Sequence, residues 1–130
     1  MKIRRAYQNP YGFSLVAHAV DDHGDLEEVG QMQVKHSGFC MRVDVVEVEQ
    51  GMQRRGIGTK LYQAAARLAC KVYKKPLCSS VERSVAAEAF WRKQVLKKRA
   101  VRVRNTKSDF EREGMFKLRC PPPASLGRIR

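Results

Sequence analysis

The stretch from Val45 to Tyr62, VVEVEQGMQRRGIGTKLY, limits what this chain can fold into more than any other. β-branched apolar residues lead into a basic turn with glycines, and an apolar pattern of helical spacing follows. The first N–H groups of a helix point outward without partners, and the helix dipole adds positive potential there. Because Gly56 and Gly58 carry no Cβ atom, the backbone of this turn can approach a phosphate closely. The stretch therefore predicts a phosphate-binding loop between a strand and a helix.

The segments before this loop predict strands and no helix. Apolar runs bounded by turn residues favour strands, and such runs cover residues 2–7, 13–20, 29–34 and 39–48. Polar turn signals separate them at Asn9–Gly12, Asp21–Asp25 and His36–Gly38. The apolar alternation in 39–48 is imperfect, which is typical of a central strand covered on both faces.

The segments after the loop predict two helices with a short strand between them. Apolar residues recur at helical spacing over 57–74, and Ser84 is a good N-cap for a second helix over 85–96. Short strands are expected over 77–81 and, as a final hairpin, over 99–103 and 115–119. A strand–helix–strand connection of this kind is right-handed and its strands are parallel. The sequence thus predicts an α+β fold, with a mostly antiparallel sheet, one parallel βαβ crossover and two main helices.

Length and composition indicate one ordinary domain. A chain of 130 residues with 43% hydrophobic content can bury a core, and we expect a single domain over 1–120 and a C-terminal tail over 121–130. No apolar run reaches the roughly 18 residues of a membrane span, and MKIRRAYQNP lacks the apolar region of a secretory signal. The four cysteines stand far apart without a C-x-x-C pair, at Cys40, Cys70, Cys78 and Cys120. We therefore expect separate buried thiols, no metal site and a cytoplasmic location.

Charge is distributed unevenly along the chain. Residues 1–50 carry 5 Lys/Arg and 8 Asp/Glu, whereas residues 51–130 carry 21 and 5. A basic half attracts polyanions, so a nucleic-acid or acidic-protein partner is one interpretation. A solvated basic surface is an equally good one, because charge alone is unspecific.

Two nucleotide-binding motifs share the outline of the loop, and neither fits. A Walker A loop needs Lys and Ser/Thr after the second glycine of Gly51-x4-Gly56, where this chain has Ile57 and Gly58. A dinucleotide fingerprint needs a third glycine where Leu61 stands, and it follows the first strand of a parallel series. A glycine pair that only shapes a turn is the remaining simple alternative.

The loop and its surroundings resemble the GNAT family of N-acetyltransferases. Gln53–Gly58, QRRGIG, is similar to the family signature Q/R-x-x-G-x-G/A. Ser84–Leu96, SVAAEAFWRKQVL, is similar to the family's later helix, N-x-x-A-x-x-F/L-Y-x-K-x-G-F. The resemblance covers residues 39 to about 103 in order and spacing, and it implies a GNAT-like fold with acetyl-CoA as cosubstrate.

The resemblance also implies where acetyl-CoA lies. N–H groups of residues 54–59 would bind the pyrophosphate, with Arg54 and Arg55 adding charge-assisted contacts. The end of strand 39–48 would splay after a β-bulge and pair with the pantetheine, and Ser84 stands where the family often has a pantetheine-contacting Asn. The expected cofactor-binding residues are Val46, Val48, Gln53, Arg54, Arg55, Gly56, Ile57, Gly58, Thr59, Ser84 and Trp91.

Acetyl transfer to an amine requires the removal of a proton, because a lysine ammonium has a pKa near 10.4. Glu47 and Glu49 are the candidate bases beside the loop, ahead of Asp44. Strict alternation would place Glu47 and Glu49 on one face of the strand and Asp44 on the other, unless a bulge intervenes. The resemblance makes the backbone at Val48 the candidate oxyanion donor.

The chain departs from the family in two places. Trp91 stands where the family usually has the Tyr that protonates the leaving thiolate, and an indole cannot supply that proton. Only a turn at Asn9–Gly12 follows the first strand, where the family usually places two helices over the acceptor site. An open acceptor side favours a macromolecular acceptor.

The predicted function is transfer of acetyl from acetyl-CoA to a primary amine, a lysine or N-terminus of a protein, by a monomer or homodimer. The alternative is a non-catalytic GNAT-like module that binds CoA, or binds nucleic acid through its basic C-terminal half.

Overall fold

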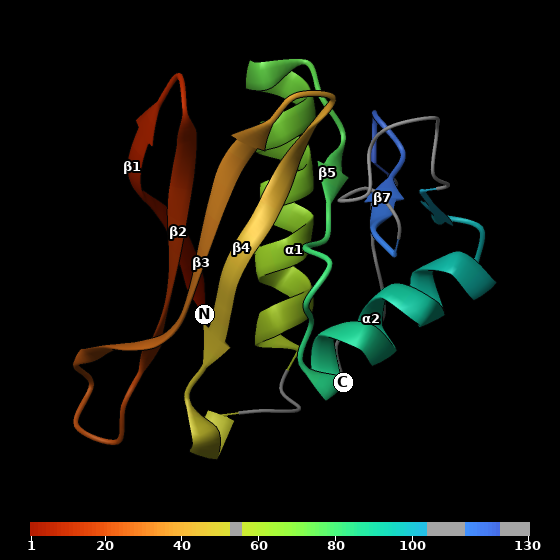
Figure 1. Ribbon diagram of the computed structural model, residues 1–130. Coiled ribbons are helices and arrows are strands. Elements are labelled where there is room, and N and C mark those ends of the chain that lie inside the picture. Colours follow the sequence, from red (N-terminus) through yellow and green to blue (C-terminus); the bar gives the residue numbers. More distant parts are fainter. Residues whose placement is uncertain (53–55, 104–113, 123–130) are drawn as a thin grey trace.

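The computed structural model describes residues 1–52, 56–103 and 114–122 (Figure 1). Four strands come first, and two helices with short strands follow. In chain order the elements are β1 (Lys2–Asn9), β2 (Gly12–Val20), β3 (Leu26–Ser37), β4 (Cys40–Val48), η1 (Gln50–Met52), α1 (Ile57–Leu68), η2 (Ala69–Tyr73), β5 (Leu77–Cys78), α2 (Val85–Leu96), β6 (Ala100–Arg102) and β7 (Phe116–Leu118).

The strands form one sheet in the order β1-β2-β3-β4-β5-β7-β6. Every neighbouring pair is antiparallel except β4 and β5, which are parallel and connected through α1. The predicted fold class is therefore confirmed. The tight turn between β1 and β2 also confirms that no helix follows the first strand in this chain.

The core lies between α1 and one face of strands β2 to β4. Leu61 and Ala65 on α1 are fully buried, as are Phe13, Met32 and Val34 on the strands. These residues recur every three or four positions on the helix and every second position on the strands, so each element presents one apolar side. The face of β3 opposite α1 carries Gln31 and Gln33, which are only half-buried.

The helices follow the sequence pattern closely. The predicted helix over 57–74 is confirmed, but its last turn, η2, is π-helical and Lys74 ends it in a left-handed conformation at φ 57°. The second helix spans Val85–Leu96 as expected, and the Oγ of Ser84 accepts the N–H of Ala87 at 3.1 Å. Through Phe90 and Trp91, α2 packs against α1 and β7.

Strand β5 is shorter than the predicted 77–81. Its pairing with β4 stops at Arg42 and Cys78, and the N–H of Ser79 instead donates to the carbonyl of Phe116 on β7 at 2.8 Å. The chain therefore separates from β4 after only two residues of β5.

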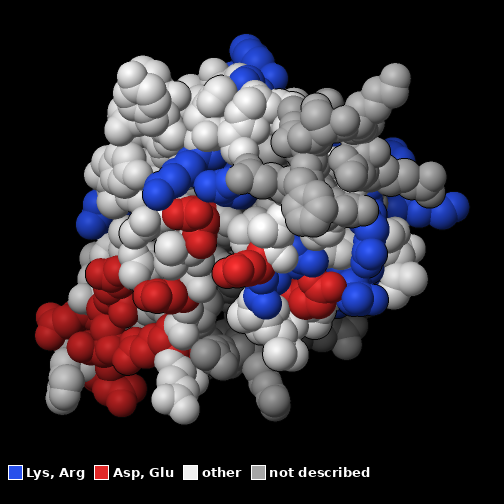
Figure 2. Space-filling view, in the orientation of Figure 1, with Lys and Arg blue, Asp and Glu red and all other residues white. Residues whose placement is uncertain are grey.

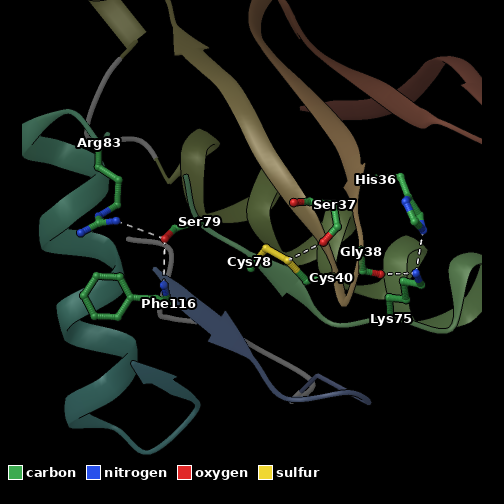
Figure 3. Close-up of a disulfide and its surroundings, with 9 residues drawn as sticks. All are labelled: His36, Ser37, Gly38, Cys40, Lys75, Cys78, Ser79, Arg83 and Phe116. Atoms are coloured by element: carbon green, nitrogen blue, oxygen red, sulfur yellow. Dashed lines mark hydrogen bonds between the residues drawn. A yellow bond between two sulfur atoms is a disulfide. The ribbon is translucent and has the colours of Figure 1, made fainter. Parts of the chain in front are cut away.

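All four cysteines are paired, so the expectation of separate thiols is wrong. Cys40 and Cys78 join β4 to β5 (Figure 3), and Cys70 and Cys120 join η2 to the residues after β7. The partners lie 38 and 50 residues apart in sequence, and only the folded topology brings them together. The argument for a reducing compartment depended on free thiols and loses its basis. Among the described residues, no helix is long and apolar enough to cross a membrane.

We predict that reduction destabilises the fold. Each disulfide closes a loop of 38 or 50 residues, and loops of this size contribute about 2–4 kcal/mol by restricting the unfolded chain. Denaturant unfolding with and without dithiothreitol measures the effect. The paired variant Cys70→Ser/Cys120→Ser should account for about half of it, and an unchanged midpoint on reduction would contradict the pairing.

Candidate active site

A cleft opens where β4 and β5 diverge. The two strands pair only at Met41 with Leu77 and at Arg42 with Cys78. Beyond Arg42 the β5-facing edge of β4 has no ladder partner among the described strands. The cleft has a volume of about 240 Å³ and is lined by Val43, Asp44, Val45, Val46 and Glu47 from β4, Tyr62 from α1, and Ser79, Ser80, Glu82, Arg83, Ser84, Ala87 and Trp91 from β5 to α2.

A β-bulge at Asp44 sets which β4 side chains face which way. Val43 pairs with Val34 of β3, but the next residue of β3, Gln33, pairs with Val45, so Asp44 is an extra residue. One extra residue reverses the alternation of everything after it. As a result Val46 and Val48 face α1 with Met32, and Glu47 faces the opposite side.

The bulge corrects the expected position of Asp44, which lies on the same face as Glu47. Its carboxylate contacts Lys35 Nζ at 3.1 Å and an Arg42 guanidinium nitrogen at 3.7 Å. Glu47 instead accepts a hydrogen bond from the Gln31 amide at 2.9 Å. Asp44 is thus held by two cations, and Glu47 has one neutral partner.

A second, more open groove meets the cleft at Glu47. Its volume is about 510 Å³, and its acidic lining residues are Glu27, Glu28, Glu47 and Glu49. The N–H of Glu49 donates to the carbonyl of Val29 at 2.8 Å, which fixes the chain just after β4. Figure 2 shows carboxylates gathered on the side of the molecule where the β2–β3 hairpin ends. The two candidate bases therefore share a negatively charged groove, and Glu47 lines both spaces.

The glycine turn ends in the helix start that the sequence predicted. Gly56 is the N-cap of α1 in a left-handed conformation, φ 78°, which a residue without Cβ adopts at little cost. Among the described residues no side chain caps this end, and no acid stands in the first turn, so its N–H groups and dipole can hold an anion. Ile57 is buried and offers only its backbone, whereas Gly58 and Thr59 are half-buried. Gln53, Arg54 and Arg55 lie outside the described residues.

Ser84 and Trp91 line the opposite wall of the cleft. The Ser84 hydroxyl oxygen is occupied as the cap of α2. Trp91 is fully buried, stacks on Phe116 at 6.1 Å between ring centroids, and meets Tyr62 and Phe90 edge-on at 5.6 Å. The indole is therefore a core group whose surface forms part of the cleft.

Several residues of the cleft were not singled out from the sequence, and Arg83 and Tyr62 have the largest side chains among them. Arg83 contacts Glu88 at 2.5 Å, Ser80 O at 2.5 Å and Gly114 O at 2.6 Å, and its guanidinium lies 4.7 Å from the centroid of the Phe116 ring. Figure 3 shows it reaching toward Ser79, with Phe116 nearby. Arg83 thereby ties β5, α2 and β7 into one wall. Its only sequence signal was its position before the Ser84 cap.

Tyr62 is the other of these two large residues. Helical spacing put it beside the apolar stripe, next to Leu61. It is buried, and its ring stacks on Phe90 at 4.1 Å. Burial raises the pKa of Tyr62 to about 12, while a hydrogen bond from Trp91 and the charge of Arg83 act in the opposite direction.

We predict that Glu88 contributes stability that is lost in acid. Hydrogen bonds from Arg83 and Arg92 lower the pKa of Glu88 below its usual 4.5. A lowered folded-state pKa gives stability that is complete above the unfolded pKa and disappears as the pH falls through the folded one. Thermal unfolding of Glu88→Gln should therefore show its full deficit at neutral pH and a smaller one near pH 3. A deficit that is the same at both pH values would contradict this origin.

No protein-family model and no curated protein sequence matches this chain. Solved structures do match its fold. A chain of the KacTA–DNA complex matches with a TM-score of 0.58 at 12% identity, covering 85% of this chain and 69% of that one. A protein assigned as a streptothricin acetyltransferase of Bacillus anthracis strain Ames, solved with acetyl coenzyme A, matches with a TM-score of 0.55 at 13% identity, covering 85% and 61%.

A nourseothricin acetyltransferase matches with a TM-score of 0.52 at 24% identity, covering 84% of this chain and 63% of that one. This chain thus spans less than two thirds of the length of either acetyltransferase. The shared arrangement of an antiparallel sheet, one parallel crossover and two helices shows that the fold of this chain is GNAT-like.

Proposed function

We propose that this chain is an acetyltransferase that moves an acetyl group from acetyl-CoA to a primary amine of a macromolecular acceptor. The observation that carries the proposal is the cleft between β4 and β5, which opens beside a glycine-capped helix start. A neighbour of the same fold was solved with acetyl coenzyme A, and two of the neighbours are acetyltransferases.

In this proposal the cofactor follows the cleft. Its pyrophosphate lies at the N-terminus of α1, where Gly56, Gly58 and Thr59 offer N–H groups. The proposal also includes Gln53, Arg54 and Arg55, which precede them in the sequence. Its pantetheine lies along the edge of β4 that faces β5, near Val46 and Val48. Ser84 and Trp91 form the facing wall. An extended chain against a free strand edge gains backbone hydrogen bonds as an added strand would.

Glu47 is the proposed base. It lines both the cleft and the acidic groove, so it stands between the thioester and the direction from which an amine enters. The amine nitrogen attacks the acetyl carbon after losing a proton to Glu47, directly or through water. The carbon–sulfur bond then breaks, and CoA leaves. Glu49 lines the groove but not the cleft, and it is proposed to attract the cationic acceptor.

The acceptor side supports a large, basic substrate. The groove carries four Glu side chains, which attract the ammonium form of an amine. The turn between β1 and β2 leaves no helix over this side among the described residues. A lysine side chain or the N-terminus of a protein fits an open, acidic groove of this kind.

A second candidate function is a non-catalytic GNAT-like module that binds CoA or nucleic acid. The observation that favours it is the basic character of the chain from the start of α2 onward, where Glu88 is the one acidic residue that the structure describes. Figure 2 shows Lys and Arg side chains on the side of the molecule that holds α2. A GNAT-like chain in the KacTA–DNA complex is compatible with such a partner. Turnover of acetyl-CoA would exclude this candidate as the whole function.

We predict that Gly58→Glu strongly weakens acetyl-CoA binding without unfolding the protein. A Cβ atom at Gly58 would meet only Val48 Cγ2, at 3.9 Å, so a side chain fits there. A carboxylate in the first turn also interacts favourably with the positive end of the helix dipole. The same charge repels a pyrophosphate. Calorimetry should show at least tenfold weaker binding with an unchanged or higher melting temperature. The matched variant Gly58→Ala adds a Cβ atom without charge and should weaken binding less than Gly58→Glu does, and wild-type binding by Gly58→Glu would argue against this site.

We predict that Glu47→Gln lowers kcat by about 10²-fold or more, the usual contribution of general base catalysis. Glu49→Gln should have a smaller effect that appears mainly in KM, because Glu49 lines only the groove. Thiol release from acetyl-CoA with a lysine-rich peptide measures both. Asp22→Asn removes one exposed negative charge from the β2–β3 hairpin and is the control. An unchanged kcat in Glu47→Gln would show that Glu47 is not the general base.

A further inference from the structure

The departing thiolate needs a hydrogen-bond donor, and few groups in the cleft can provide one. The Ser80 hydroxyl donates to the carbonyl of Glu82. Ser79 lines the cleft but is only 1% exposed, and its Oγ accepts from the N–H of Phe116 at 2.9 Å and from Arg83 at 3.3 Å. Ser84 is exposed at the mouth, where it caps α2. The hydroxyl of Tyr62 is the candidate whose ring is fixed by aromatic contacts.

The ring of Tyr62 is held firmly between two aromatic side chains of α2. It stacks on Phe90 with 12° between the ring planes and meets Trp91 edge-on at 85°. Such packing restricts both side-chain torsions of a tyrosine and fixes the direction of its hydroxyl. Since Tyr62 also lines the cleft between β4 and β5, a preorganised phenol stands at the wall where a pantetheine chain would pass.

The contact with Trp91 leaves the phenolic proton of Tyr62 available. An indole N–H can only donate, so the Trp91 side chain cannot accept that proton. In the described part of the chain, no protein acceptor receives the Tyr62 proton. The residue that replaces the family's usual tyrosine therefore packs edge-on against a different tyrosine and does not accept its proton.

We propose that Tyr62 is the group that stabilises the leaving thiolate of CoA, a role that rests on the acetyl transfer proposed above. As nitrogen bonds to the acetyl carbon, the electron pair of the carbon–sulfur bond moves onto sulfur. The Tyr62 O–H donates a hydrogen bond to that sulfur. Glu47 holds the first proton lost by the ammonium, the nitrogen gives its second proton to water as the amide forms, and the thiolate leaves and takes a proton from water.

The acidity of Tyr62 agrees with a donor that keeps its proton. With a pKa of about 12 the phenol is neutral throughout the physiological range and cannot act as a base. A thiol has a pKa near 8.5, so the sulfur gains a hydrogen bond from Tyr62 without taking its proton. The bound thiol should then be more acidic than it is without this donor.

The test compares Tyr62→Phe with wild type, and Tyr73→Phe is the matched control. Tyr73 lies in η2 on the same helical segment, and its hydroxyl donates to Asn9 O at 2.6 Å and Gly12 O at 2.9 Å, away from the cleft. Calorimetry between pH 7 and 10 with CoA, and with a CoA analogue that lacks sulfur, reports the thiol pKa of bound CoA. Thermal unfolding checks that each variant folds.

In Tyr62→Phe, the pKa of bound CoA thiol should rise by about one unit, whereas affinity for the sulfur-free analogue should stay within about threefold. The kcat for acetyl transfer should fall tenfold or more with a similar KM for acetyl-CoA. Tyr73→Phe should match wild type in each measurement. An unchanged thiol pKa and kcat in Tyr62→Phe, with wild-type turnover intact, would overturn the role of Tyr62 alone. Absence of acetyl-CoA binding by wild type would overturn the proposed function and this role together.

Discussion

The aromatic contacts among Tyr62, Phe90, Trp91 and Phe116 hold together the parts of the molecule that surround the cleft. They join α1, α2 and β7 on one side of the gap, while β4 continues into the sheet on the other. Rings of this size bury large apolar areas, and their edge-on and stacked geometries restrict how the elements can shift. The gap between β4 and β5 can stay open because this packing supports its walls without strand pairing.

Charge is divided across that gap. The strands before the glycine turn carry the acidic groove, and the elements after it carry most of the basic residues. A cosubstrate rich in phosphate and a cationic amine would therefore approach from different sides. Their reacting ends would meet near Glu47, which lines both spaces. The bulge at Asp44 makes this possible, because without the extra residue Glu47 would point toward α1.

Local signals predicted much of this fold. The cap at Ser84, the bounds of α2 and the strand–glycine turn–helix order depend on neighbours in sequence and were read from them directly. The bulge at Asp44 could not be predicted in this way, because it depends on how β3 and β4 align. The pairing of Cys40 with Cys78 was missed for the same reason, since it needs the parallel crossover to form first. Tyr62 was missed because its burial is produced by α2.

The two disulfides have a consequence for the continuity of the chain. One closes the span from Cys40 to Cys78 and the other closes the span from Cys70 to Cys120. The spans overlap between Cys70 and Cys78, so every peptide bond from Cys40 to Cys120 lies inside a covalent ring. All residues that line the cleft between β4 and β5 fall within this range. A single proteolytic cut anywhere in it would leave both fragments attached to each other.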